Sequence, residues 1–317
     1  MIYILLFTIL FVVELSYFRI ADHFNIIDKP NQRSSHTQIT LRGGGVIFYI
    51  GMLIYFTVEG FQFPWFIIGL TLISAISFAD DLKPQSSKLR LIIHLIAMIC
   101  LFYQWDLFHL PWYYTILSLI LCIGILNAYN FMDGINGITG GYSLVVAVAF
   151  WYVNSFQISF IDNQLIYILI LSLLVFNFFN FRKKAKCFAG DVGSISIAFI
   201  LIFILGKLVI KTYDFSYLIL FVVYGVDSIL TIIHRLILKE NIFEPHRKHL
   251  FQLMANELKI SHLLVTGIYM LLQTVIIVGF LFIKTKYLYL AVVIVVLSML
   301  YVSIKRRYYH LHECISK

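Results

Sequence analysis

The sequence predicts an all-α protein that crosses a membrane about eleven times. Hydrophobic residues make up 61% of the 317 residues, and the mean hydropathy is +0.91. Only 13% of the residues are charged, and the polar segments between the apolar runs are too short to form a soluble domain. Because a membrane-spanning helix needs about 20 mostly apolar residues, this composition is typical of a polytopic membrane protein. We therefore interpret residues 1–317 as a single multi-pass domain.

Eleven apolar segments are long enough to form helices that span the bilayer or nearly do so. The first begins at Ile2 and lacks both a basic region before it and a cleavage site of small residues. We expect it to remain as a membrane helix and not to be removed as a signal peptide. The expected spans are residues 2–20, 43–59, 63–79, 89–105, 112–132, 138–155, 164–181, 193–212, 216–236, 262–283 and 287–304.

Basic residues are distributed unevenly between the two predicted sides of the membrane. Twenty of the 24 Lys and Arg residues lie on one side, and the other side holds only Lys207, Lys211, Lys284 and Lys286. Loops rich in Lys and Arg stay in the cytoplasm, so the N-terminus is expected outside and the C-terminus in the cytoplasm. The net charge of +8 mainly reflects this topology, and it would also favour anionic substrates at the cytoplasmic face.

Three polar side chains, Asn127, Asn130 and Asp133, follow one another at intervals of three residues at the end of the fifth span. At about 100° per residue they share one sector of a helix. Two amides and a carboxylate are costly in lipid, so this sector is expected to face the inside of the protein. Residues 134–137 include two glycines, which allow a tight turn and the close approach of a ligand. A polar helix end followed by a glycine turn is the simpler alternative.

A pair of adjacent carboxylates, Asp80 and Asp81, ends the third span. Adjacent carboxylates repel each other, so either the pKa of one rises toward a value that suits a base, or a cation is bound between them. Lys88 and Arg90 follow before the next span, where they are placed to hold phosphate oxygens. A solvated loop with basic anchors is the alternative, but it does not account for the acidic pair.

Two glycine-containing segments lie on the same predicted side of the membrane. In the first, Arg42 precedes glycines 43–45, whose N–H groups are suited to contact a phosphate while the guanidinium supplies charge. In the second, Asp191 stands between Gly190 and Gly193 before a predicted helix, where it suits a Mg²⁺ ligand. The alternatives are a flexible helix entry for the first segment and an ordinary N-cap for Asp191.

A fourth polar loop carries His234, Arg235 and then the basic segment 243–249. These groups indicate either a contact with an anion or a sugar, or simply a basic cytoplasmic loop. Asp227 lies about two turns inside the ninth span. A charge at that depth costs about 2.5–3.5 kcal/mol on insertion scales, so we expect Asp227 to face the interior of the bundle.

Taken in order, these motifs resemble the signature of the polyprenyl-phosphate N-acetylhexosamine-1-phosphate transferases, glycosyltransferase family 4. The loop containing Arg33-Ser-Ser-His36 and the eleven-span topology are similar to the undecaprenyl-phosphate N-acetylglucosamine-1-phosphate transferase branch. The resemblance covers nearly the whole chain. It rests on Asp80-Asp81 with Lys88-Leu-Arg90, on Asn127-x-x-Asn130-x-x-Asp133-Gly-x-Asn136-Gly137, and on Gly190-Asp191-x-Gly193-Ser194.

The resemblance implies transfer of an N-acetylhexosamine 1-phosphate from a UDP-sugar to undecaprenyl phosphate, with release of UMP. It implies Mg²⁺, or Mn²⁺ in its place, and a multi-pass protein of the bacterial inner membrane. The product would initiate a cell-surface polysaccharide such as the O-antigen of lipopolysaccharide, a capsule or a related cell-wall glycan. The expected partners are both substrates and the bilayer, with a homodimer left open and no nucleic acid.

The resemblance also implies roles for individual residues. One of the paired aspartates would activate or orient the lipid phosphate, and Asn130 and Asp191 would bind the metal. The catalytic residues would be Asp80, Asp81, Asp133 and Asp191. The substrate-binding residues would be Arg42, Lys88, Asn127, Asn136 toward the uracil, and Arg247 and His249 toward the sugar.

Two positions depart from the family pattern. Family members often have a His-x-His-His loop, whereas this chain has His249-Leu-Phe-Gln252, and Leu41 stands where many relatives have proline. We expect Phe251 to offer an apolar ring to the donor sugar and to favour a methyl group at C6 by about 1–3 kcal/mol. The choice between N-acetylglucosamine and a 6-deoxy N-acetylhexosamine stays open.

A multi-pass transporter or flippase of an anionic or lipid-linked substrate is the alternative function. Transporters place ionisable groups near the middle of the membrane, often in interrupted helices of two matching halves. Here the acidic residues gather at the predicted cytoplasmic helix ends, with Asp227 as the main exception, and the sequence shows no inverted repeat. The transferase is therefore the favoured interpretation.

Overall fold

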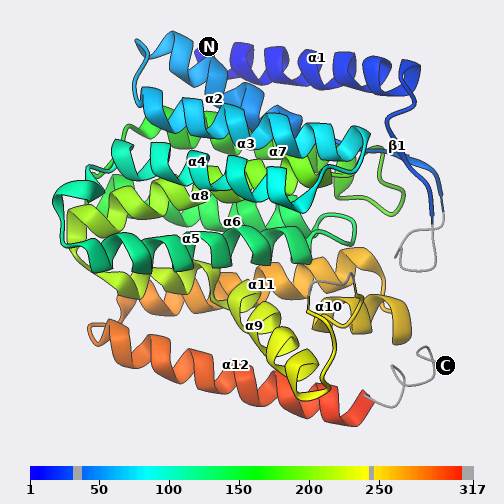
Figure 1. The fold of residues 1–317 in the computed structure, drawn as a ribbon, viewed down its shortest axis with the longest axis vertical. Helices are drawn as coiled ribbons and strands as arrows, with labels where there is room; N and C mark the ends of the chain where they lie inside the picture. The colour runs from blue at the N-terminus through cyan, green and yellow to red at the C-terminus, as the bar shows by residue number, and fades with distance from the viewer. Residues whose placement is uncertain (31–37, 243–245, 309–317) are drawn as a thin grey trace.

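The computed structural model describes residues 1–30, 38–242 and 246–308, and these ranges form a bundle of long helices (Figure 1). Each predicted span coincides with a helix. Within the described ranges, nine helices are long and apolar enough to cross a membrane. They are α1 (Ile2–His23), α3 (Pro64–Leu82), α4 (Ser87–Gln104), α5 (Trp112–Met132), α7 (Asn163–Asn180), α8 (Gly190–Thr212), η3 (Phe215–Phe221) with α9 (Val222–Ile237), α11 (His262–Phe282) and α12 (Lys286–Tyr308).

Two further helices are shorter than a full span. Helix α2 (Val46–Val58) has 13 residues, and α6 (Ile138–Tyr152) has 15 and continues into the π-helical turn η2 (Val153–Gln157). A glycine with a positive φ precedes each of them, Gly43 before α2 and Gly137 before α6. Helix α2 begins three residues later than its predicted span, whereas α6 begins at the predicted residue. The all-α polytopic fold class is confirmed, whereas the number of crossings and the orientation stay predictions.

Helix α8 runs through the centre of the bundle. Sixteen of its 23 residues are buried, as is typical of a helix that is apolar on all sides. It packs against α3 through the stacked rings of Phe66 and Phe203, whose centroids are 4.0 Å apart. Deeper contact comes from the Ser74 and Ser196 hydroxyls, which are 2.7 Å apart. This packing fixes the depth of α8 and therefore the position of its N-terminus.

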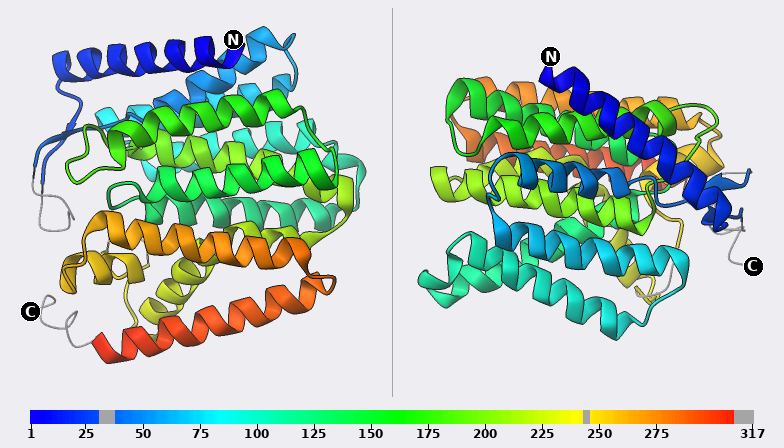
Figure 2. Two further views of the ribbon diagram at one scale, coloured as in Figure 1. Left: turned by 180° about the vertical axis from the view of Figure 1, so that it is seen from behind. Right: turned by 90° about the horizontal axis from the view of Figure 1, so that it is seen from above.

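Helices α1 and α12 form opposite edges of the bundle in both face views (Figures 1 and 2). Their outer faces are apolar; on α12, for example, Leu288, Val292 and Met299 are exposed. A continuous apolar surface of this kind is unfavourable in water and suits contact with lipid chains.

The polar loops gather at one end of the bundle, on the right in Figure 1. Strand β1 (Ile27–Asp28) pairs antiparallel with β2 (Thr40–Leu41) there, and Leu41 bridges to Cys187. The short helices α10 (Leu250–Gln252) and η4 (Leu253–Glu257) lie at the same end, while η1 (Leu107–His109) joins α4 to α5. Helix α1 starts away from the polar loops and runs toward them, and α12 also finishes beside them (Figure 1).

The loop of glycines 43–45 is held against α8 by backbone contacts. The N–H groups of Gly44 and Gly45 donate to the carbonyls of Phe188 and Ala189 at 2.9 and 3.1 Å. A Cβ atom added to Gly45 would lie 2.2 Å from the Cα of Gly193, and neither backbone can move aside without breaking these bonds. A side chain at position 45 is therefore excluded.

Gly45→Ala is expected to lower the free energy of unfolding by about 1–3 kcal/mol, because it overpacks a contact between two backbones. Thermal unfolding of the detergent-solubilised protein measures the effect. Gly267→Ala is the matched control, because an added Cβ there would meet no atom of the described residues within 4 Å. Equal unfolding temperatures for the two variants would contradict the packing argument.

Candidate active site

Asp81 joins three segments of the polar end. Its carboxylate accepts hydrogen bonds from the backbone N–H groups of Asp191 and Val192 at 2.9 and 3.0 Å, in the first turn of α8. It also pairs with Nε of Arg42 at 2.6 Å, and its side chain is fully buried. A helix N-terminus carries unpaired N–H groups and a partial positive charge, which an anion stabilises. Asp81 is thus held from two sides at the end of α3.

Asp80 has a different environment from its neighbour. Its Oδ1 accepts a hydrogen bond from the N–H of Gln85 at 2.6 Å, and its Oδ2 lies 2.9 Å from Nη1 of Arg90. The side chain of Asp80 retains 12% of its exposure, whereas that of Asp81 retains none. The two adjacent carboxylates therefore have separate partners, and only Asp80 is accessible.

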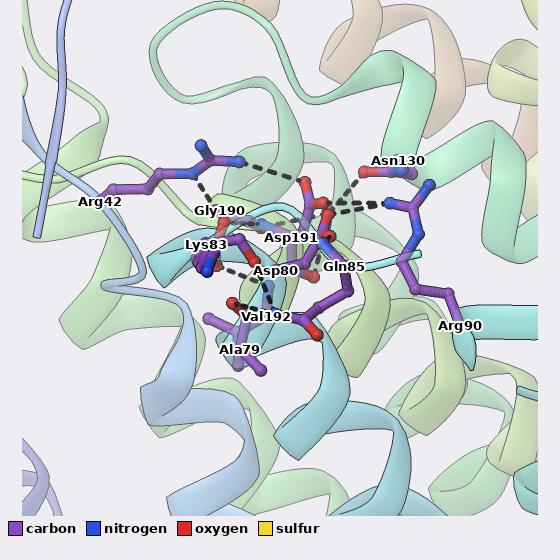
Figure 3. A network of polar contacts seen from close by, with 12 residues as sticks. Arg42, Ala79, Asp80, Lys83, Gln85, Arg90, Asn130, Gly190, Asp191 and Val192 are labelled. Atoms are coloured by element: carbon purple, nitrogen blue, oxygen red, sulfur yellow. Dashed lines mark hydrogen bonds and ion pairs between the residues drawn. The ribbon is translucent and has the colours of Figure 1, made fainter. Parts of the chain in front are cut away.

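A third carboxylate, Asp191, lies between two guanidinium groups. Its Oδ1 is 3.6 Å from Nη2 of Arg42, and its Oδ2 is 3.9 Å from Nη1 of Arg90. Figure 3 shows Arg42 and Arg90 reaching toward Asp191 and Asp80 from opposite sides. The cluster therefore places three carboxyl groups, those of Asp80, Asp81 and Asp191, against two guanidinium groups.

Helix α5 contributes Asn130 and Asp133 to the same region. The amide oxygen of Asn130 accepts a hydrogen bond from Ser194 at 3.2 Å, which ties α5 to α8. Asp133 follows the last residue of α5 and accepts a hydrogen bond from Thr139 at 2.7 Å. Burial raises the pKa of Asp133 to about 6, and the Thr139 hydroxyl opposes that rise. Near neutral pH Asp133 is therefore mainly ionised.

A cavity of about 960 Å³ adjoins this cluster, between α4, α5 and α9. Its wall is polar near the cluster and apolar farther along the helices. The polar wall includes Arg90, Asn127, Asn130, Asp133, His246, His249 and Gln252. The apolar wall includes Leu91, Ile120, Leu121, Ile125, Phe221, Ile229 and Ile232. A ligand with a charged head and a long apolar tail fits this division.

Comparison with known proteins agrees with the motifs and their arrangement. The sequence model of glycosyl transferase family 4 matches residues 63–209, which carry Asp80, Asp81, Asn130, Asp133 and Asp191. Residues 63–209 therefore carry the sequence pattern of this family. The matched segment contains the four predicted catalytic aspartates, which the fold brings to one end of the bundle.

Curated relatives match over most of the chain. A probable undecaprenyl-phosphate N-acetylglucosaminyl 1-phosphate transferase of Bacillus subtilis is 26% identical over 309 residues, covering 90% of this chain and 85% of the relative. The undecaprenyl-phosphate alpha-N-acetylglucosaminyl 1-phosphate transferase of Escherichia coli K12 is 26% identical over 276 residues, covering 79% and 74%. The Yersinia pestis protein of the same name is 28% identical over 225 residues, covering 65% and 61%.

Family 4 implies a divalent metal, and the donor chemistry of the cluster suits Mg²⁺. Among the described residues, no three His, Cys, Asp or Glu side chains form a ready-made metal site. Mg²⁺ is typically bound by one or two carboxylates together with waters and substrate phosphates, so a complete protein cage is not required. The carboxylate of Asp191 and the amide oxygen of Asn130, which lie in the same cluster (Figure 3), are oxygen donors of the kind that such an ion needs.

Asp191 lies inside α8 and not before it. The helix begins at Gly190, three residues earlier than the predicted span, and the N-cap position is Ala189. The side chain of Asp191 makes no capping hydrogen bond, so the alternative of an ordinary N-cap is wrong. Its carboxylate is directed toward the cluster instead (Figure 3).

Four predicted substrate-binding residues lie outside the cavity wall, and their roles stay predictions; one of them, Arg42, belongs to the carboxylate cluster. Lys88 is exposed in the first turn of α4, and Arg90 lines the cavity in its place. Asn136 is buried and donates from its amide to the carbonyls of Arg182 and Lys183 at 2.9 and 3.3 Å. Arg247 is partly buried, 3.9 Å from Glu257. The segment Arg33-Ser-Ser-His36 lies outside the described residues.

The residues of the histidine loop divide between cavity wall and core. His249 and Gln252 line the cavity, as does His246, which the sequence did not single out. Phe251 is fully buried, and its ring lies against Gly134 instead of in the cavity wall. The expectation that this ring contacts the donor sugar is therefore wrong. Asp227, by contrast, faces the interior of the bundle as predicted, with 3% of its surface exposed.

The different environments of the paired aspartates predict different losses on substitution. Asp81→Asn removes the charge that the α8 N-terminus and Arg42 share, so the free energy of unfolding is expected to fall by about 2 kcal/mol. Asp80→Asn is expected to change it by less than about 1 kcal/mol, because its ion pair is partly exposed. Scanning fluorimetry in detergent compares the two variants, and equal unfolding temperatures would contradict an anchoring role specific to Asp81.

Proposed function

We propose that this protein transfers an N-acetylhexosamine 1-phosphate group from a UDP-sugar to undecaprenyl phosphate. The products are UMP and undecaprenyl-diphospho-N-acetylhexosamine. The observation that carries the proposal is the cavity whose polar end adjoins three carboxylates and two guanidinium groups, while its other end is apolar. The names of the relatives, which specify undecaprenyl phosphate and N-acetylglucosaminyl 1-phosphate, support the lipid acceptor and the transferred group.

The cavity suits a lipid phosphate. Several of its apolar wall residues, including Leu91, Ile120 and Ile229, are exposed, and we infer that the cavity opens toward the face that would contact lipid. A prenyl chain could enter there and place its phosphate near Arg90, at the boundary between the apolar and polar walls. Burying the chain against apolar side chains would contribute about 25 cal/mol per Å².

The reaction forms one bond and breaks one bond at the β-phosphorus of the donor. An oxygen of the lipid phosphate attacks that phosphorus, and the bridging oxygen leaves with its electron pair as part of UMP. Positioning and charge neutralisation account for most catalysis of phosphoryl transfer. Arg90 and Arg42 neutralise phosphate charge from opposite sides, and Asp80, the accessible member of the pair, orients the attacking phosphate. Asp81 holds the Arg42 loop and the start of α8 in place.

Asp191 and Asn130 would hold the Mg²⁺ ion. When bound, the ion neutralises the charge that develops on the phosphate oxygens of the donor. Asp133, at the end of α5, stays ionised near neutral pH and adds negative charge to the same region. These three residues belong both to the family motifs and to the polar region around the cluster.

We place the polar end of the bundle in the cytoplasm of a bacterial cell, with eleven crossings of the inner membrane. The positive-inside rule supports this orientation, because the four basic residues on the other side lie in the C-terminal part of α8 and at the turn between α11 and α12, whereas the cluster lies at the N-terminus of α8. Helices α1 and α12 both finish beside the polar loops, so the start of α1 points away from the end of α12, which agrees with an odd number of crossings. The product would then initiate a cell-surface polysaccharide.

The transporter alternative depended mainly on Asp227, the charge deepest in a predicted span. Asp227 accepts hydrogen bonds from Tyr269 at 2.6 Å and from the N–H of Leu250 at 3.0 Å, and it pairs with His249 at 3.3 Å. These partners stabilise the buried charge within the local structure. Asp227 therefore does not indicate an ion pathway.

Purified protein in lipid nanodiscs is expected to release UMP from UDP-N-acetylglucosamine only when undecaprenyl phosphate and Mg²⁺ are present. Chelation of divalent metal should abolish the release, and Mg²⁺ or Mn²⁺ should restore it. A panel of other UDP-N-acetylhexosamines, with lipid products identified by mass, then ranks the donors. No lipid diphosphosugar from any donor in the panel would overturn the proposed function.

Asp191→Asn is expected to reduce turnover by about 100-fold or more, because an amide is a weaker Mg²⁺ ligand and carries no charge. The unfolding temperature should change little, since the side chain makes no capping bond. The measurement is UMP release at saturating substrates, with Asp22→Asn, an exposed acid near the end of α1, as control. Near-normal turnover of Asp191→Asn would remove this residue from the metal site.

A further inference from the structure

Asp227 is the centre of a buried hydrogen-bond network that joins four helices. Its Oδ2 accepts from the Tyr269 hydroxyl of α11 at 2.6 Å. Its Oδ1 lies 3.0 Å from the backbone N of Leu250, 3.2 Å from the Thr231 hydroxyl and 3.3 Å from Nδ1 of His249. Thr231 also contacts the Tyr301 hydroxyl of α12 at 2.7 Å.

The network determines how the imidazole of His249 is oriented. An ionised carboxylate can only accept hydrogen bonds, so Nδ1 of His249 carries the proton that lies between the two groups. The ring also lies near two aromatic neighbours, Phe131 at 6.0 Å and Phe251 at 5.9 Å between centroids, with interplanar angles of 31° and 24°. Both the tautomer and the plane of the ring are therefore set by the surrounding protein.

The other ring nitrogen of His249 has no such partner. Nε2 is buried and has no hydrogen-bond partner among the described residues, although the ring forms part of the cavity wall. In a neutral imidazole protonated at Nδ1, Nε2 carries a lone pair and can only accept. Buried polar atoms are normally paired, so an unpaired acceptor in a cavity wall indicates a ligand that donates a hydrogen bond.

We propose that Asp227 is a positioning residue that presents Nε2 of His249 to the donor substrate, where it accepts a hydrogen bond from a hydroxyl or amide N–H of the hexosamine. The inference rests on the proposed function. Phosphate oxygens are themselves acceptors, so a lone pair at Nε2 favours the sugar over the diphosphate. The phosphate-binding guanidinium of Arg90 belongs to α4, on a different wall of the same cavity.

The loop that carries His249 has other attachments, so a change at Asp227 should leave it folded. Glu240 forms ion pairs with Arg235 at 3.1 Å and with Lys248, and Lys305 donates to the Lys248 carbonyl. In Asp227→Asn the amide oxygen can still accept from Leu250. The substitution removes the negative charge, and it replaces a group that only accepts hydrogen bonds with an amide that can also donate. Both of the lost properties select the Nδ1–H tautomer.

A double-mutant cycle tests the inference. Asp227→Asn, His249→Ala and the double variant are assayed for UMP release, varying UDP-N-acetylglucosamine and undecaprenyl phosphate separately. Asp227→Asn is expected to lower kcat/KM for the donor by about 10- to 100-fold, as loss of a partner that orients a histidine does elsewhere. KM for undecaprenyl phosphate should stay within about twofold, because the substitution does not change the groups that bind the lipid.

In the His249→Ala background, Asp227→Asn should change kcat/KM for the donor by less than about twofold, since its effect acts through the missing ring. If the two single-variant losses in kcat/KM multiply in the double variant, or if KM for the lipid rises, Asp227 acts on the fold instead. Asp214→Asn is the matched control. Asp214 is likewise a paired acid, 3.6 Å from Lys286, but it follows the C-terminus of α8, away from the cluster at the N-terminus of that helix, and its replacement should change neither constant.

A second measurement does not depend on turnover. In protein labelled with ¹⁵N-histidine, the signal that disappears in His249→Ala should show the Nδ1–H tautomer, and Asp227→Asn should give a mixture. Tyr269→Phe, which removes one donor to Asp227, should leave the tautomer unchanged. An Nε2–H tautomer in the unaltered protein would overturn the inference. Absence of UMP release with the Nδ1–H tautomer present would instead overturn the proposed function and leave the positioning of His249 intact.

Discussion

The structure depends on the contact between Asp81 and the first turn of α8. A buried carboxylate is costly unless donors surround it, and here two backbone N–H groups and the Arg42 guanidinium do so. The contact only forms if the 43–45 loop approaches α8 closely, which requires glycine at position 45. One charged side chain therefore sets the position of α3, of the Arg42 loop and of the helix that carries Asp191. The catalytic geometry that we propose follows from it.

Much of the fold could be predicted because lipid imposes a strict rule on sequence. A helix in hydrocarbon must be apolar over a length set by the bilayer, so every predicted span coincides with a helix. The rule fails where a helix is surrounded by protein. Helix α2 is three residues shorter at its start than its apolar run, because tertiary hydrogen bonds hold Gly44 and Gly45 outside the helix. Likewise, α8 extends back to Gly190, where Asp81 accepts its free N–H groups.

The residues of the site were predictable where their chemistry is costly in lipid. Adjacent aspartates at a helix end and amides on one helical sector need polar partners inside the protein, and the structure gathers them at one end of the bundle. Side-chain direction was not predictable. Lys88 and Arg90 are separated by about 200° around α4, and only the packing of that helix decides which one faces the cavity. The position of Phe251 was missed for the same reason, since an aromatic ring suits a core as well as a sugar site.

The exposed apolar residues of the cavity wall determine how the concentration of the lipid substrate has to be expressed. A ligand that enters the cavity from the side arrives by diffusion within the plane of the membrane, whereas a nucleotide arrives from the water. The relevant abundance of the lipid is its mole fraction among neighbouring lipids, and bulk molarity has no bearing on occupancy. Doubling the total membrane at fixed lipid substrate would halve that mole fraction while leaving the nucleotide supply unchanged. Enzymes that share one pool of carrier lipid would therefore compete by surface density.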